Sequence, residues 1–116
     1  MNEPVPASAF VVNTLCRADA SWLVSVEGEL DTATAPTLGV TLDELAAKGP
    51  NVVALELSRV SFMDSSGLRV IVRATNALAE RGGELSVEGV SATVRRTLEI
   101  TGLLEHLRGD RVAPID

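Results

Sequence analysis

The chain has 116 residues, of which 46% are hydrophobic and 3% aromatic, and its formal net charge is −6 at pH 7. Its length fits a single domain with a buried core. The negative charge argues against binding to nucleic acid or to anionic membranes, since both require a basic surface, and the scarcity of aromatic side chains argues against stacking on bases.

The N-terminal residues and the cysteine content indicate a cytoplasmic protein. Residues 1–8 contain two prolines and are expected to form a flexible lead-in, followed by one domain over residues 9–116. They lack the cationic start of a signal peptide, and no apolar run approaches the roughly 18 residues of a membrane span. Cys16 is the single cysteine and has no partner for an intrachain disulfide, which fits a reducing compartment. We expect its side chain to be buried in the first strand.

The domain opens with two extended runs over residues 10–16 and 22–27. The polar turn between them predicts an antiparallel hairpin, in which Val24 and Val26 share one face. A helix is predicted next, with Thr34 as its N-cap and an end near residue 49. Its core stripe, spaced by three and four residues, consists of Leu38, Leu42 and Leu45.

The rest of the chain alternates between strands and helices. The apolar run 51–57 predicts a strand buried on both faces, and the apolar spacing from Leu68 onward predicts an amphipathic helix. The expected elements are a strand over 51–57, a helix over 66–81, a strand over 84–88, a helix from Ser91 to Gly102, a fifth strand, and a last helix that is short or absent. This order predicts a single α/β domain with a mixed sheet and helices packed against it, in the order β-β-α-β-α-β-α-β.

A carboxylate and two hydroxyls lie where the third strand turns into the second helix. Asp64, Ser65 and Ser66 can each supply an oxygen that caps the helix, and one interpretation is a capping turn and nothing more. Loops at strand ends also collect binding residues, and a helix N-terminus stabilises an anion. A phosphoryl group on either serine would then be compatible with the fold, while its charge beside Asp64 would repel a docked partner. The loop is therefore a candidate release switch.

Two arginines follow this loop on one face of the predicted helix. Arg69 and Arg73 are four residues apart in the first half of the helix, where cations oppose the helix dipole and repel each other. They are either an ordinary solvated face or a basic patch that meets acids on a partner or shields a phosphoryl group.

An enzyme is the weaker interpretation. Ser65 lacks the G-x-S-x-G pattern of a nucleophile elbow, and the one histidine, His106, lies far along the chain and is expected at the surface or in a loop. One cysteine and one histidine do not make a metal-ligand set, and no phosphate-binding loop is present. We therefore expect no catalytic residue, no metal and no cofactor.

Four segments, taken in order, carry a resemblance to a known family. Residues 60–68, Val-Ser-Phe-Met-Asp-Ser-Ser-Gly-Leu, resemble the signature of the anti-sigma factor antagonists, which are bacterial regulators built on the STAS domain. Residues 28–36, 82–85 and 94–103 are similar to further segments of the same family. The resemblance extends from about residue 11 to residue 107.

The resemblance implies a function and a set of partners. Members of this family bind an anti-sigma factor that is also a serine kinase, which sets the sigma factor free. The kinase phosphorylates the serine after the aspartate, and a PP2C-type phosphatase restores the active form. By position this serine is Ser65, with Ser66 as second choice. Including the two arginines, the expected partner-binding residues are Asp31, Thr32, Met63, Asp64, Ser65, Ser66, Gly67, Leu68, Arg69 and Arg73.

Some features leave alternatives open within the family. Arg69 stands where many relatives carry a small residue, which affects partner choice in this interpretation. STAS domains also serve as stressosome scaffolds and as subunits of lipid-transport ABC systems, where a serine in this loop serves docking alone. Association of the chain with itself is not decided by the sequence.

Overall fold

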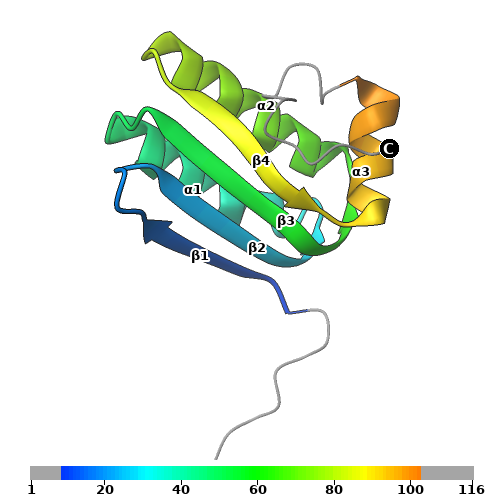
Figure 1. Cartoon of the computed structure of the whole chain (residues 1–116). Helices are drawn as coiled ribbons and strands as arrows, with labels where there is room; N and C mark the ends of the chain where they lie inside the picture. Colours follow the sequence, from blue (N-terminus) through cyan, green and yellow to red (C-terminus); the bar gives the residue numbers. More distant parts are fainter. Residues whose placement is uncertain (1–8, 103–116) are drawn as a thin grey trace, which may run out of the picture.

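The computed structural model describes residues 9–102, and its centre is a four-stranded sheet (Figure 1). The strands lie in the order β1-β2-β3-β4. β1 (Val11–Cys16) and β2 (Trp22–Leu30) form the predicted antiparallel hairpin, whereas β3 (Val52–Met63) runs parallel to both β2 and β4 (Glu84–Val90). Parallel neighbours require crossover connections, which the helices between the strands supply.

Two of the three helices lie side by side on one face of the sheet. In Figure 1, α1 (Ala35–Ala47) and α2 (Ser65–Glu80) are behind the strands, and they pack against each other. α3 (Ala92–Thr101) contacts β3 and β4, and the Ser91 hydroxyl before it donates a hydrogen bond to the Val60 carbonyl, 2.7 Å away. The mixed α/β fold is confirmed, in the order β-β-α-β-α-β-α over the described residues.

The core lies between the sheet and the helices, as the apolar spacing predicts. Val24 and Val26 of β2 are buried together, and the α1 stripe of Leu38, Leu42 and Leu45 faces them. β3 is buried on both faces in its first half, where Ala54 is as inaccessible as its neighbours Val53 and Leu55.

The strands extend further than the sequence pattern predicts. β2 continues to Leu30 instead of ending near residue 27, and β3 continues to Met63 instead of ending near residue 57. The polar residues at 58, 59 and 61 interrupt the apolar run and imitate a loop, yet β3 continues through them, and Arg59 is a register partner of Glu27 in β2. Two irregularities in this pairing shift the register by two residues between Trp22↔Val53 and Leu30↔Met63.

The prediction that Cys16 is buried is wrong. Cys16 ends β1, which is an edge strand, and its side chain is exposed. α1 and α2 pack against β2, β3 and β4, whereas β1 packs mainly against β2. The end of β1 therefore lies outside the area that these helices cover. The predicted lead-in 1–8, the fifth strand, the last helix and His106 lie outside the described residues. Among residues 9–102, no helix is long and apolar enough to span a membrane.

Candidate functional site

The loops that follow β2 and β3 lie next to each other at one end of the sheet. Leu30 and Met63, the last residues of the two parallel strands, are register partners. The first backbone N–H after β3, that of Asp64, donates to the carbonyl of Leu30 over 3.1 Å. The fold therefore brings together two loops that are more than thirty residues apart in the sequence.

Asp31 organises the first loop. Its Oδ1 accepts hydrogen bonds from the backbone N–H groups of Ala33 (3.0 Å) and Thr34 (3.1 Å). Thr34 occupies the predicted N-cap position, but its side chain does not cap α1. Its hydroxyl instead donates to the Glu29 carbonyl at 2.7 Å and accepts from the Asp31 N–H at 2.9 Å. An aspartate expected at the docking face thus also shapes the loop from within.

Asp64 organises the second loop as the N-cap of α2. Its backbone is extended, and its Oδ1 accepts from the N–H groups of Ser66 (2.8 Å) and Gly67 (3.4 Å). The capping interpretation is confirmed for this residue, because two of the orphan donors of the first turn are satisfied. α2 starts at Ser65, so this serine lies at the first helical position.

The two serines differ in what holds their hydroxyl groups. Ser66 is half-buried, and its Oγ lies 3.1 Å from the Oγ1 of Thr32 in the first loop. Ser65 is exposed, and no hydrogen bond engages its hydroxyl within residues 9–102. No general base in this part of the chain is hydrogen-bonded to Ser65 in a way that would activate it as a nucleophile.

Three further residues of the predicted site lie beneath its surface. Met63 is 4% exposed, Gly67 is buried, and Leu68 packs on the core. A Cβ atom on Gly67 would lie 2.7 Å from the Cγ of Leu30 and 3.0 Å from that of Met63. The lack of a side chain here lets α2 approach the strand ends. These residues support the loop, while Thr32 and Ser65 present it to solvent.

A groove leads away from the loops between α1 and α2. It encloses about 390 Å³, and both Arg69 and Arg73 line it together with Thr32 and Ser66. The arginines are exposed on α2. The structure thus places them on one surface with the loops, a relation that the three-and-four spacing of α2 alone does not give.

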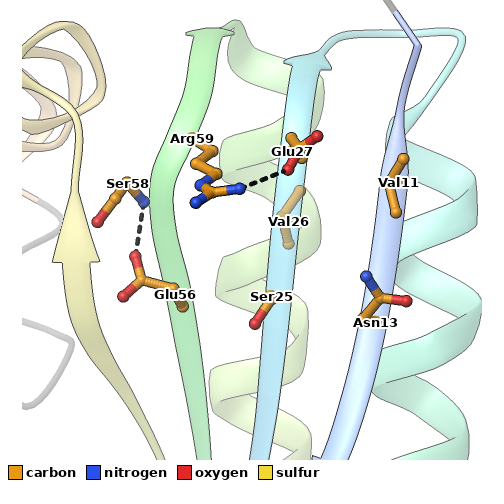
Figure 2. A pocket seen from close by; sticks show the side chains of 8 residues that line it. All are labelled: Val11, Asn13, Ser25, Val26, Glu27, Glu56, Ser58 and Arg59. Atoms are coloured by element: carbon orange, nitrogen blue, oxygen red, sulfur yellow. Dashed lines mark hydrogen bonds and ion pairs between the residues drawn. The ribbon is translucent and has the colours of Figure 1, made fainter. Parts of the chain in front are cut away.

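The opposite face of the sheet carries a separate polar hollow of about 470 Å³ (Figure 2). Arg59 donates to Glu27 over 3.3 Å, and the Ser58 N–H donates to Glu56 over 2.8 Å. Figure 2 shows these side chains in front of the strands with the helices behind, so this hollow and the groove lie on different faces. No group of three or more His, Cys, Asp or Glu side chains in the described region is arranged to hold a metal.

Known proteins share this fold and much of this sequence. The STAS domain model matches residues 13–114. An anti-sigma-B factor antagonist of Staphylococcus aureus is 40% identical over 85 residues, which cover 73% of this chain and 79% of the relative. The crystal structure of an anti-sigma factor antagonist from Mycobacterium paratuberculosis matches with a TM-score of 0.81 and 26% identity, covering 97% of this chain and 92% of that one. The phosphorylated form of the Bacillus cell fate determinant SpoIIAA shares the fold, with a TM-score of 0.67 and 22% identity over 93% and 92% of the chains.

The chain therefore belongs to the STAS domain family. Within that family its similarity is to the anti-sigma factor antagonists, which are regulatory proteins and not enzymes. The resemblance seen in residues 60–68 and the three accompanying segments is confirmed by these matches.

Proposed function

We propose that this protein is an anti-anti-sigma factor that binds an anti-sigma factor serine kinase and is released when Ser65 is phosphorylated. In this proposal the protein acts in the cytoplasm, binding frees the sigma factor, and a PP2C-type phosphatase returns the chain to its binding form. The names of the relatives support the antagonist role, and the exposure of Ser65 supports its choice as the phosphorylated residue.

The observation that carries the proposal is the difference between the two hydroxyls at the start of α2. Ser65 is exposed and its hydroxyl has no hydrogen-bond partner in the described residues, whereas the Ser66 hydroxyl contacts Thr32 at 3.1 Å. A kinase must reach the hydroxyl and align it with a phosphate without first breaking its contacts. Ser65 meets this requirement, which favours it over Ser66.

A phosphoryl group on Ser65 would change the surface and leave the fold in place. It would add about −1.5 to −2 units of charge at the first residue of α2, where the helix dipole favours an anion. The same charge would lie one residue from the Asp64 carboxylate, so a partner that docks an acidic or apolar surface on this loop would be repelled. Unfavourable juxtaposition of this kind costs several kcal/mol, and each 1.4 kcal/mol weakens binding about tenfold.

A phosphorylation assay tests the proposal. The purified chain is incubated with its cognate anti-sigma factor kinase and Mg-ATP, and the modified residue is mapped by mass spectrometry. Wild type and Ser66→Ala are expected to accept one phosphoryl group on Ser65, while Ser65→Ala accepts none. Absence of transfer to wild type would contradict the proposal and favour a STAS subunit that docks without switching, and transfer to another residue would contradict the assignment to Ser65.

A further inference from the structure

The groove between α1 and α2 has an apolar floor that begins at the phosphorylation loop. Thr32 and Ser66 form its loop end, and Val40 and Val70 line it from the two helices. Val40 is 57% exposed. Gly39 also lines the groove, and a Cβ atom there would lie 3.7 Å from a Val70 methyl carbon, so the helices approach closely at this point. An apolar surface is thus continuous with the proposed docking loop.

Among residues 9–102, the two arginines on the edge of this groove have no acidic partner. Neither Arg69 nor Arg73 forms an ion pair within residues 9–102, and both side chains are exposed. Asp43 lines the same groove without pairing with either of them. Arg69 and Arg73 are the fifth and ninth of the 16 residues of α2, so they lie about one turn apart on one face and repel each other. Exposed and without an ion pair in the described residues, both guanidinium groups are available to a partner.

We propose that this groove binds an acidic amphipathic helix of the kinase, with two carboxylates one turn apart that face Arg69 and Arg73. The proposal rests on the proposed function, since the same partner engages the loop at Ser65. Arginines four residues apart on α2 are separated by about 6 Å along the helix axis, which matches carboxylates three or four residues apart on a partner helix. Guanidinium groups bind carboxylates through paired, charge-assisted hydrogen bonds. Apolar side chains on the partner's inner face would cover Val40 and Val70.

Other occupants fit the groove less well. Nucleic acid requires more cations than two, and the chain as a whole carries −6. A second copy of the chain has no matching helix in the described region, because Asp43 and Glu44 of α1 are adjacent and do not share a face, and α2 and α3 each carry a single acid, Glu80 and Glu99. With a net negative chain, the local arginines would direct an acidic segment to this surface.

Charge reversal tests the groove. Affinity for the purified cognate kinase is measured by calorimetry at low and high salt for wild type, Arg69→Glu/Arg73→Glu and the control Arg81→Glu. Arg81 is an exposed arginine at the far end of α2, about 18 Å along the helix from Arg69. The double variant is expected to bind at least about tenfold more weakly at low salt, and added salt should strengthen its binding, because it screens the repulsion between the new glutamates and the partner's acids. The control is expected to remain within about twofold of wild type. The side chains of Arg69 and Arg73 are exposed, so we expect the fold to be retained, which circular dichroism checks.

Cross-linking identifies the occupant. The sequence has one lysine, Lys48, which is exposed at the end of α1. Arg69→Lys and Arg73→Lys keep the charge and introduce amines that a carbodiimide joins to nearby carboxylates. We expect each variant to cross-link to one acid of the kinase, the two acids being three or four residues apart in one helix. Cross-links to separate segments, to Lys48 alone, or to a second copy of the chain would overturn the proposal.

The two proposals fail in different ways. If wild type is neither bound nor phosphorylated by the kinase, the proposed function fails. If wild type is bound and phosphorylated on Ser65 but the double variant binds equally well, the groove proposal alone is wrong.

Discussion

The hydroxyl groups of Thr32 and Ser66 lie 3.1 Å apart and join the loops that follow β2 and β3. This contact makes one surface of two segments that are 34 positions apart in the sequence. The contact engages the hydroxyl of Ser66, while the side chain of Ser65 is exposed. The structure thus distinguishes two adjacent serines that the local sequence does not.

Removing this contact is expected to weaken the fold slightly. Thr32→Val should lower the free energy of unfolding by about 0.5–1.5 kcal/mol, the usual contribution of one hydrogen bond. Ser66→Ala should have a similar effect, and the double variant should cost less than the sum of the two because the hydroxyls share one interaction. Urea denaturation measures the free energy of unfolding of wild type, the two single variants and the double variant. Fully additive losses would show that the two hydroxyls are not coupled.

Gly67 is expected to tolerate no side chain. Gly67→Ala places a methyl group 2.7 Å from the Cγ of Leu30, which is completely buried, and such overpacking typically costs about 1–3 kcal/mol. Gly39→Ala is the matched control, since its Cβ would meet Val70 at 3.7 Å and alanine favours the helix interior by about 0.5–1 kcal/mol. Thermal unfolding should show a loss for the first variant and a gain or no change for the second. An unchanged unfolding midpoint for Gly67→Ala would contradict this prediction and would mean that Leu30 and Met63 can move aside at little energetic cost.

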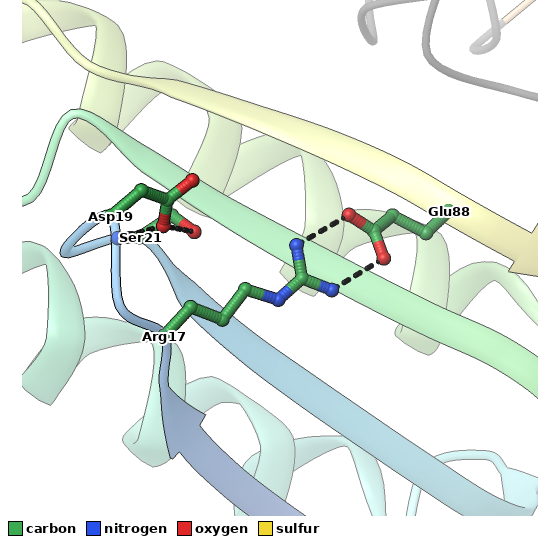
Figure 3. A network of polar contacts seen from close by, with 4 residues as sticks. All are labelled: Arg17, Asp19, Ser21 and Glu88. Carbon is green, nitrogen blue, oxygen red and sulfur yellow. Dashed lines mark hydrogen bonds and ion pairs between the residues drawn. The ribbon is translucent and has the colours of Figure 1, made fainter.

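The ion pair between Arg17 and Glu88 crosses the sheet face opposite α1 and α2 (Figure 3). Two hydrogen bonds, of 2.6 and 2.7 Å, link the end of β1 to β4, and the bond to Glu88 raises the pKa of the Arg17 guanidinium above its ordinary value. Both side chains are about one-third exposed, so we expect a coupling of about 0.5–1 kcal/mol that decreases with salt. A double-mutant cycle with Arg17→Met and Glu88→Gln measures it. A coupling of zero at low salt would contradict the geometry.

The turn between β1 and β2 is expected to respond to acid. The Ser21 hydroxyl and backbone N–H both donate to Asp19, at 2.7 and 3.0 Å, and they hold the pKa of this carboxyl below its ordinary value of 3.8 (Figure 3). A lowered native pKa means that the contribution to stability is present above pH 3.8 and is lost as the pH falls through the native value. Asp19→Asn should therefore show less loss of stability than wild type below pH 4, measured by denaturation across pH. Identical acid profiles would contradict this assignment.

Substitutions at Ser65 separate charge from shape. Ser65→Asp should keep the thermal midpoint, because an acid at the first position of α2 suits the helix dipole, and should weaken kinase binding. Ser65→Ala should bind as wild type does and remain unphosphorylated. Calorimetry with the kinase compares the three proteins. Equal affinity for Ser65→Asp and wild type would argue against charge as the switch.

The sequence predicted the direction of the strands from the hairpin turn and from the alternation of strands with helices, and the order of the elements because apolar periodicity reports directly on burial. It placed Asp64 at the start of α2 for the same reason. The predicted end of β3 is wrong because exposed polar side chains follow a backbone that stays in the strand, as at Ser58 and Arg59. The contact between the two loops could not be predicted from the sequence, because the approach of Thr32 to Ser66 depends on a β2–β3 register that contains two irregularities. No local pattern encodes that register.

The most direct test of the central claim is the dissociation constant of the kinase for the chain before and after phosphorylation on Ser65. The two forms are separated by anion exchange, and the modified residue is verified by mass spectrometry before each is titrated into the kinase. We expect the phosphorylated form to bind at least about tenfold more weakly while its circular dichroism spectrum is unchanged. Equal affinity of the two forms would contradict the central claim.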